Sequence, residues 1–173
     1  MGDFKKNIAL IGFMATGKST IGPLLAEKNG YALIDTDKLV EADMGMKIAA
    51  IFSTMGEESF RKAEHKALKK ALEMDKAVIS TGGGMILLKK NRELLTQKAF
   101  VVSLSAQPET IFDRVKGDNT RPLLKCEDPL LRIKQMLAER QQYYDCCDFK
   151  ISTDDWTAEQ CCQKILEAYR ETK

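Results

Sequence analysis

The chain has 173 residues, a length that suits one domain with a complete hydrophobic core. Its formal net charge is +2, and its 27 lysines and arginines and 25 aspartates and glutamates are spread along the whole chain. This distribution lacks the basic stripe of nucleic-acid-binding proteins, so we expect no polynucleotide partner. The apolar runs are too short to cross a membrane and residues 1–7 are polar and charged in character, so we expect a cytoplasmic protein without a targeting segment.

A glycine-rich motif follows the first predicted strand. Residues 8–11 form a short apolar run of the kind buried in a parallel sheet, and residues 20–28 have the apolar spacing of a helix. Between them, Gly12 to Ser19 matches the phosphate-binding loop G-x-x-x-x-G-K-[ST], in which backbone N–H groups and Lys18 bind phosphates and the Ser19 hydroxyl binds Mg²⁺. The motif predicts a nucleoside triphosphate as ligand. The alternative is a chance glycine turn before an ordinary helix.

Two aspartates follow the second predicted strand, residues 31–34. Ligands of open α/β sheets bind beyond the carboxyl ends of the strands. Asp35, at the strand tip, is placed to hold Mg²⁺ through water, and Asp37 is placed to reach a substrate hydroxyl. The alternative for Asp37 is an N-cap of the helix predicted over residues 38–43.

A helical insertion is predicted over residues 36–74, and it is longer than a single crossover helix requires. Its part from 47 to 74 contains two helical segments broken at Met55-Gly56. Arg61 lies on the second segment. His65, the single histidine of the chain, lies in the same charged stretch, where we expect a solvated helix position and no catalytic role.

Three glycines, Gly82 to Gly84, follow the third predicted strand, residues 77–80. Their bare backbone lets a ligand approach closely, although a flexible turn uses the same residues. Two more strands are predicted at residues 100–104 and 149–151. Because strands and helices alternate, the sequence predicts a single α/β domain with a parallel sheet and helices on both faces.

The segment 117–128 is the least regular part of the chain, and we expect it to be a mobile flap or lid over the site. It contains Arg121, and Arg140 lies on a helix predicted over residues 129–144. An arginine can grip a carboxylate or neutralise a phosphoryl group, although a single arginine in a charged chain is more often a surface ion pair. The apolar spacing of residues 157–172 predicts a helix that covers the sheet.

The five cysteines lie late in the chain, at Cys126, Cys146-Cys147 and Cys161-Cys162. Adjacent cysteines do not match the common zinc-binding spacings, and an odd number of cysteines favours reduced thiols. A metal site built from the two pairs is the less favoured alternative, because no histidine lies near them in the sequence.

The order and spacing of these motifs resemble the shikimate kinase family along almost the whole chain. The residues that carry the resemblance are Gly12 to Ser19, Asp35-Thr36-Asp37, Phe60-Arg61-Lys62-Ala63-Glu64, Gly82-Gly83-Gly84, Arg121-Pro122-Leu123-Leu124, and Arg140 with Tyr144. The resemblance implies three αβα layers and a five-stranded parallel sheet of order 2-3-1-4-5, as in nucleoside monophosphate kinases. It also implies ATP-dependent, Mg²⁺-assisted phosphorylation of the shikimate 3-hydroxyl, a step of aromatic amino acid biosynthesis through chorismate.

The resemblance assigns roles to individual positions. The ATP-binding residues that it implies are Gly12, Ala15, Thr16, Gly17, Lys18, Ser19, Thr20 and Arg121. The Mg²⁺ ligands would be Ser19 and Asp35. The shikimate-binding residues would be Asp37, Arg61, Gly83, Gly84 and Arg140, and Glu64 would hold an arginine or a substrate hydroxyl in place. The catalytic residues would be Lys18, Asp37 and Arg121.

The chain departs from the family pattern in two places. Ala15 stands where members often carry glycine, which bears on nucleotide affinity. Residues 143–148 are one residue shorter than the usual run before the last strand, which bears on the register of Arg140.

Two alternative functions stay open on the sequence. Another small-molecule kinase, such as a gluconate kinase, would share the phosphate loop, but it has no reason to pair Arg61 with the triple glycine. A non-catalytic nucleotide-binding regulator would not need the set Asp37, Arg61, Arg121 and Arg140. For the kinase we expect a monomer whose partners are ATP and shikimate.

Overall fold

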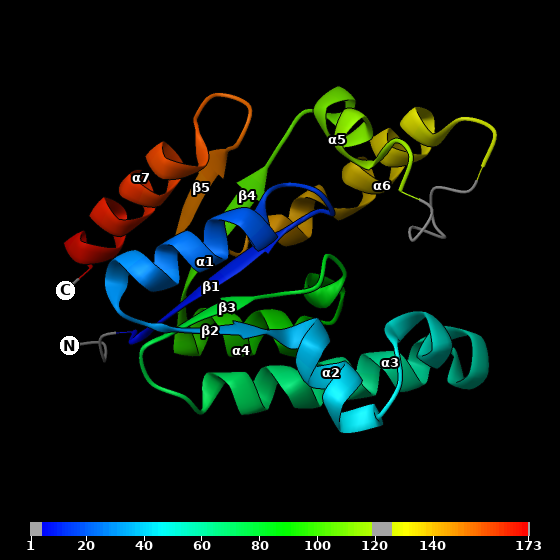
Figure 1. Ribbon diagram of the computed structural model, residues 1–173, viewed down its shortest axis with the longest axis horizontal. Helices are drawn as coiled ribbons and strands as arrows, with labels where there is room; N and C mark the ends of the chain where they lie inside the picture. Colours follow the sequence, from blue (N-terminus) through cyan, green and yellow to red (C-terminus); the bar gives the residue numbers. More distant parts are fainter. Residues whose placement is uncertain (1–4, 119–125, 173) are drawn as a thin grey trace.

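The computed structural model describes residues 5–118 and 126–172 of the chain. Five parallel strands form one sheet in the order β2-β3-β1-β4-β5, which confirms the predicted order, and helices cover both faces (Figure 1). The strand ends agree with the predicted runs to one residue. The strands are β1 (Asn7–Gly12), β2 (Ala32–Asp35), β3 (Ala77–Ser80), β4 (Ala99–Ser105) and β5 (Phe149–Ser152).

The helices form the two outer layers. The helices on one face are α1 (Lys18–Asn29) and α7 (Ala158–Glu171), and those on the other are α3 (Ile48–Leu72), α4 (Lys89–Lys98), α5 (Pro108–Val115) and α6 (Pro129–Tyr144). The remaining elements are α2 (Thr36–Met44), which packs on α3, and the short 3₁₀ helix η1 (Met85–Leu87). Among the described residues, no helix is both long and apolar enough for a membrane span.

Strand β1 shows why the sheet is buried on both sides. Successive side chains of a strand point to opposite faces. Ile8 and Leu10 belong to the core beneath α1 and α7, whereas Ala9 and Ile11 belong to the core beneath α3 to α6, and all four are fully buried. The continuous apolar run is therefore the pattern expected of a central parallel strand.

The predicted break at Met55-Gly56 is confirmed as a kink inside α3. Gly56 has φ 81° and ψ 171°, a backbone conformation that is nearly restricted to glycine. The segment before the kink packs on α2 through Ile51 and Val40, and the segment after it runs back along the sheet and adds Phe60 to the same small core. The kink therefore turns one half of α3 toward α2 and the other half toward the sheet.

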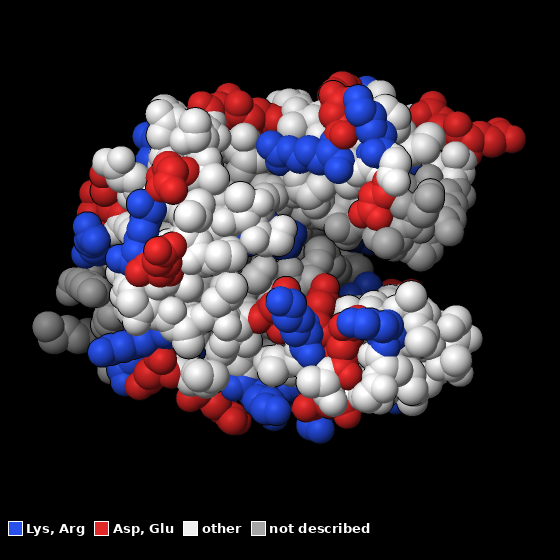
Figure 2. Space-filling view, in the orientation of Figure 1, with Lys and Arg blue, Asp and Glu red and all other residues white. Residues whose placement is uncertain are grey.

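The strands end level with one another at one edge of the sheet. Leu10 of β1 and Asp35 of β2 are both in register with Ser80 of β3, and Gly12 is in register with Leu104 of β4. The loops that follow β1, β2 and β3 therefore emerge side by side. Figure 2 shows the surface hollowed at this end of the molecule, between α2–α3 and α5–α6.

Candidate active site

The loop after β1 has a backbone that depends on its glycines. A Cβ atom on Gly12, which has φ 152°, would lie 2.5 Å from the Leu104 carbonyl oxygen and 2.7 Å from Thr16 Oγ1. Thr16 in turn donates a hydrogen bond to the Phe13 carbonyl at 2.8 Å. Ala15 has φ 57°, in the left-handed region that glycine adopts without strain. Ala15 thus stands at a position where a glycine would be free of backbone strain.

The inner side of this loop is built to receive an anion. Helix α1 begins at Lys18 with no side-chain cap and no acidic residue in its first turn, so its first N–H groups face outward at the positive end of the helix. The Lys18 ammonium donates to the carbonyls of Gly12 and Phe13, at 2.7 and 2.8 Å, and lies across the loop. An ammonium beside these N–H groups can hold phosphate oxygens.

Asp35, and not Asp37, caps α2. The Asp35 carboxylate oxygen Oδ1 accepts hydrogen bonds from the N–H groups of Asp37 and Lys38, at 2.9 and 3.2 Å. The alternative that made Asp37 the N-cap is therefore wrong, because α2 begins earlier than predicted, at Thr36. Asp37 lies in the first turn of α2, and its side chain faces the turn after β3, where a Cβ on Gly82 would lie 2.8 Å from Asp37 Oδ1.

The triple glycine is where the other parts of the site meet. A Cβ on Gly83 would lie 3.4 Å from the backbone nitrogen of Met14 in the phosphate loop, and one on Gly84 would lie 2.6 Å from both terminal nitrogens of Arg61. Only the backbone of this turn therefore lies between the phosphate loop and Arg61 of α3. A Cβ on Gly84 would displace the Arg61 guanidinium, whereas one on Gly83 would be in ordinary contact with the phosphate loop.

Arg61 and Glu64 form a buried ion pair behind this turn. The Arg61 Nη1 atom donates to Glu64 Oε2 at 2.8 Å, and the two side chains are 17% and 1% exposed. The other oxygen, Oε1, is buried and accepts no hydrogen bond from the described part of the chain. Burial raises the pKa of Glu64 against the lowering effect of the Arg61 guanidinium, and the Asp37 carboxylate raises it further. Glu64 thus holds Arg61, as the resemblance implies.

Helix α6 reaches both loops. The Tyr144 hydroxyl donates to the Gly83 carbonyl at 3.2 Å, and the Arg140 guanidinium carbon lies 5.8 Å from the centre of the Phe13 ring. Burial raises the pKa of Tyr144 to about 12, against the effect of nearby Arg140, so the phenol stays protonated and can donate. The neighbouring Tyr143 lies under Arg92 instead. Tyr144 is therefore the tyrosine that accompanies Arg140 at the site.

Two cavities flank the phosphate loop. One, of about 380 Å³, is lined by Ala15, Gly17, Ser19 and Thr20 of the loop and by Arg114, Thr153 and Trp156. Arg114 donates to the Ala15 carbonyl at 2.9 Å and to Thr153 Oγ1 at 3.1 Å. Arg114, Thr153 and Trp156 were not among the predicted site residues, although Thr153 directly follows the carboxyl end of β5, where ligands of such sheets bind.

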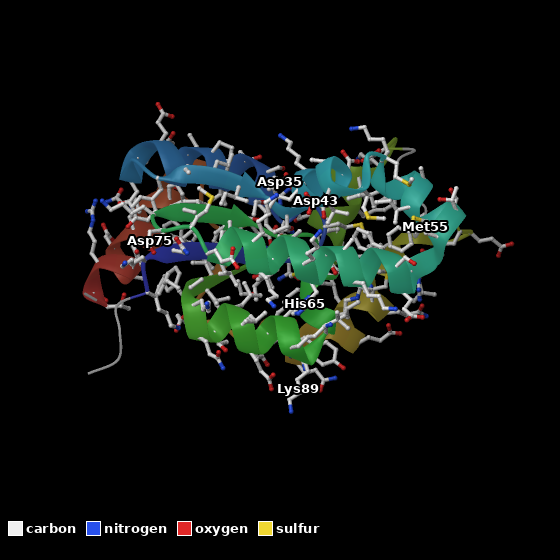
Figure 3. All side chains as sticks on the ribbon, turned by 90° about the horizontal axis from the view of Figure 1, so that it is seen from below. Asp35, Asp43, Met55, His65, Asp75 and Lys89 are labelled. Carbon is white, nitrogen blue, oxygen red and sulfur yellow. The ribbon has the colours of Figure 1, made fainter. Side chains whose placement is uncertain are left out.

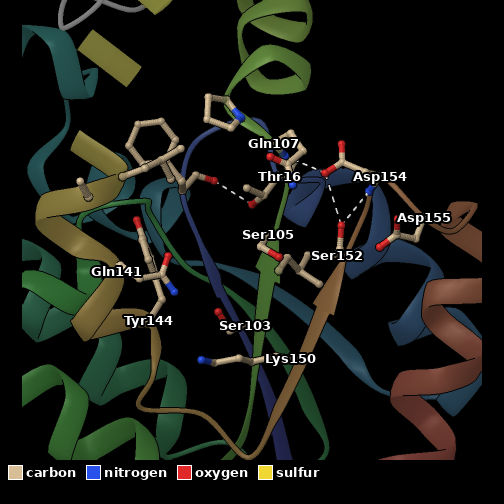
Figure 4. A pocket seen from close by; sticks show the side chains of 16 residues that line it. Thr16, Ser103, Ser105, Gln107, Gln141, Tyr144, Lys150, Ser152, Asp154 and Asp155 are labelled. Carbon is tan, nitrogen blue, oxygen red and sulfur yellow. Dashed lines mark hydrogen bonds between the residues drawn. The ribbon is translucent and has the colours of Figure 1, made fainter. Parts of the chain in front are cut away.

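The second cavity, of about 550 Å³, lies between α6 and the ends of β4 and β5 (Figure 4). Its walls carry Ser103, Ser105 and Ser152 from the strands and Gln141 from α6. Asp154 at its rim accepts hydrogen bonds from the Gln107 N–H and the Ser152 hydroxyl, at 2.6 and 3.3 Å. Among the predicted site residues that the structure describes, Thr16 alone lines this cavity.

His65 is not the solvated helix residue that we expected. It is half-buried, and its Nδ1 atom lies 2.6 Å from Oδ1 of Asn91 on α4. The expectation was wrong because the lysines around His65 lie on the exposed side of α3, while His65 itself faces α4 (Figure 3).

Arg121 lies outside the described residues. The same holds for positions 119–125 of the predicted flap over 117–128. Its predicted role as a catalytic and ATP-binding residue therefore stays a prediction.

The cysteine pairs lie on opposite sides of the sheet. Cys161 and Cys162 are buried in the core beneath α1 and α7, whereas Cys146 and Cys147 pack against the other core. All five cysteines are free thiols.

Comparison with known proteins gives the family. A family model described as shikimate kinase matches residues 14–170. The shikimate kinase of Caldicellulosiruptor bescii is 44% identical over 164 residues, which cover 95% of each chain, and that of Symbiobacterium thermophilum is 42% identical over 95% of this chain and 97% of its own. The solved shikimate kinase of Acinetobacter baumannii in complex with shikimate is 36% identical, with a TM-score of 0.92 over 97% of this chain and 94% of that chain.

More distant structures share the fold alone. A gluconokinase from Sinorhizobium meliloti is 14% identical with a TM-score of 0.61. The much higher identity and structural agreement with shikimate kinases, along nearly the full length, decide the family. The chain belongs to the shikimate kinase family.

Proposed function

We propose that this protein transfers the γ-phosphoryl group of ATP to the 3-hydroxyl of shikimate. The observation that carries the proposal is the contact between the phosphate loop and the triple-glycine turn, with a Cβ on Gly83 only 3.4 Å from Met14 N. A phosphoryl donor on the loop and an acceptor on the turn would be neighbours. An enzyme catalyses phosphoryl transfer mainly by such alignment of donor and acceptor and by stabilising the charge on the transferring group.

The acceptor side suits a hydroxylated carboxylic acid. Arg61, held by Glu64, presents its guanidinium beside the bare backbone of Gly84, and such a fork binds a carboxylate through two parallel hydrogen bonds. Arg140 supplies a second positive charge beside Phe13. Asp37 faces Gly82 and is the group we assign to a substrate hydroxyl, which it would orient toward the donor.

The donor side suits a nucleotide. Phosphates would bind the N–H groups at the start of α1 and the Lys18 ammonium. The ammonium would then exchange its hydrogen bonds with the loop carbonyls for hydrogen bonds with phosphate oxygens. The adjoining cavity of about 380 Å³ has room for the base, with Arg114 and Trp156 in its walls as flat partners for an aromatic ring. We therefore place the base there and not in the larger cavity, which lies on the far side of the loop.

The residues proposed for Mg²⁺ fit that ion. Mg²⁺ prefers hard oxygen ligands and keeps several of its waters. Ser19 offers a hydroxyl at the exposed start of α1, and Asp35 keeps Oδ2 available because the described hydrogen bonds to its carboxylate both go to Oδ1. When bound, the ion would neutralise charge on the phosphate oxygens.

A coupled assay of ADP release tests the proposal. With Mg²⁺ and ATP, we expect ADP release that depends on shikimate, with the new phosphate ester on its 3-hydroxyl. Lys18→Ala, which removes one charge that meets the transferring group, should lower kcat by about 100-fold or more while the protein stays folded. ADP release that is independent of shikimate, or equally fast with gluconate, would contradict the proposal and favour one of the two alternatives.

The proposal extends to the cellular compartment, the oligomeric state and the domain organisation. A kinase that uses ATP, with five free cysteines, fits the reducing cytoplasm. We propose that the protein works there as a monomer, which light scattering would test. Residues 36–74 would form the acceptor-binding insertion of a single domain over residues 1–173, since α2 and α3 pack on each other through a small core of their own.

A further inference from the structure

The turn from Gly82 to Met85 lies at the centre of the acceptor site, yet three of its four residues have no side chain. Its position depends on side chains from other elements. Thr36 of α2 accepts a hydrogen bond from the Gly82 N–H at 3.3 Å, Tyr144 of α6 donates to the Gly83 carbonyl at 3.2 Å, and Asn91 of α4 donates from Nδ2 to the Met85 carbonyl at 3.0 Å. Each of these bonds anchors the turn to a different helix.

Asn91 is fully buried, and the hydrogen bonds of its amide have a defined direction. The Met85 carbonyl can only accept, so the amide nitrogen of Asn91 must face it. The amide oxygen then faces His65, at 2.6 Å from Nδ1. Because that oxygen can only accept, Nδ1 of His65 must carry the hydrogen.

His65 links this chain of bonds to the helix that bears Arg61. The two residues are four positions apart on α3 and so lie on the same side of the helix. In Figure 3, His65 lies between α3 and α4. The glycine turn is thus held against α3 at two places, by the Arg61 contact with Gly84 and by the path from His65 through Asn91 to Met85.

We propose that His65 is a positioning residue of the acceptor site: its Nδ1–H orients Asn91, which holds the glycine turn in register with Arg61. The inference rests on the proposed function, because it takes this turn to be the shikimate site. A Cβ on Gly84 would lie 2.6 Å from the guanidinium, so the turn and Arg61 have no spare room, and a shift of the turn changes where Arg61 meets a carboxylate. The role of His65 should therefore appear in shikimate binding and leave ATP binding unchanged.

Three variants on α3 test this role by steady-state kinetics. His65→Leu removes the donor at similar size, and we expect the KM for shikimate to rise about tenfold, the scale of one lost hydrogen bond and a buried amide oxygen left unpaired. His65→Asn keeps an N–H close to the place of Nδ1 and should stay within about threefold of wild type, since less than 1 kcal/mol changes. Lys69→Leu, at an exposed position of the same helix, is the matched control and should behave as wild type. The KM for ATP should not change in any of them.

Amide hydrogen exchange gives a readout that does not depend on shikimate turnover. Exchange at residues 82–87 should be faster in His65→Leu than in wild type and unchanged in His65→Asn. If His65→Leu does not fold, His65→Ala, which suits a helix better, takes its place.

Two results would overturn the inference: a donor-free variant with wild-type KM and wild-type exchange, or an equal rise of KM in the donor-free variant and in His65→Asn. If the wild-type protein does not phosphorylate shikimate, the proposed function fails, and the exchange measurement still decides whether His65 holds the turn.

Discussion

Arg61 shows how one residue combines an ion pair with a binding role. Its guanidinium contacts Glu64 and the exposed Glu57, at 2.8 and 3.2 Å, yet its side chain is only 17% exposed and faces Gly84. Removing one partner of a buried pair leaves the other charge uncompensated, so an alanine variant would mix lost stability with lost binding. A variant that keeps the charge separates the two effects.

Arg61→Lys should therefore keep the fold and weaken the acceptor. A lysine ammonium can still pair with Glu64, but it cannot bind a carboxylate through the two parallel bonds of a planar fork. We expect the dissociation constant for shikimate to rise about tenfold, with kcat affected much less. Isothermal calorimetry and steady-state kinetics would measure the two quantities. Unchanged shikimate affinity would mean that Arg61 serves only its ion pair.

Glu64 gives a prediction about pH and stability. Its pKa is raised above 4.5 in the folded protein, chiefly by burial, so the folded state binds this proton more tightly than the unfolded state does. The stability that this proton contributes is fully present below the unfolded pKa and is lost as the pH rises through the folded pKa. Glu64→Gln cannot titrate. Its Tm relative to wild type should therefore increase from pH 4 upward and become constant once the pH exceeds the folded pKa. A Tm difference that is constant across this range would contradict the assignment.

At the scale of the element, the kink in α3 decides what the helix can present. A straight helix could not both pack Ile51 against α2 and carry Arg61, Glu64 and His65 along the sheet. Gly56 makes the change of direction through its backbone alone, since a Cβ added there would meet no atom within 4 Å. The kink is thus a matter of backbone conformation and not of packing.

Gly56→Ala should destabilise the protein through backbone strain. Residues other than glycine rarely adopt the φ and ψ of Gly56, because that backbone conformation costs them about 1–3 kcal/mol. Gly30→Ala is the matched comparison, because Gly30 also has open space around it but has φ 63°, in the milder left-handed region. Denaturant unfolding should show a larger loss of free energy for Gly56→Ala than for Gly30→Ala. Equal losses would mean that α3 can straighten at Gly56.

At the scale of the whole molecule, the two ligands bind to loops that share one sheet edge. Because a ligand that binds only the folded state stabilises it by mass action, a concentration of 100 times Kd adds about 2.7 kcal/mol, or roughly 5–10 °C in Tm for a chain of this size. We expect shikimate and a non-hydrolysable ATP analogue each to raise the Tm, whereas gluconate should not. A thermal shift with the ATP analogue alone, and none with shikimate, would support a nucleotide-binding regulator.

The sequence by itself determined the sheet, the phosphate loop and the family. Short apolar runs define buried parallel strands, and the motif from Gly12 to Ser19 depends on residues that are adjacent in the chain, so local patterns suffice for both. The kink at Gly56 was predictable for the same reason, since a glycine interrupts a helical pattern where it stands.

Only the tertiary structure decided how these parts meet. That Asp37 faces Gly82, that Arg61 lies against Gly84, and that His65 reaches Asn91 all depend on contacts between elements that are far apart in the chain. The same holds for the cavity formed by Arg114, Thr153 and Trp156 beside the phosphate loop. The spacing of apolar residues shows which side of a helix or strand is buried. It does not show which polar side chains of a distant element that side will meet.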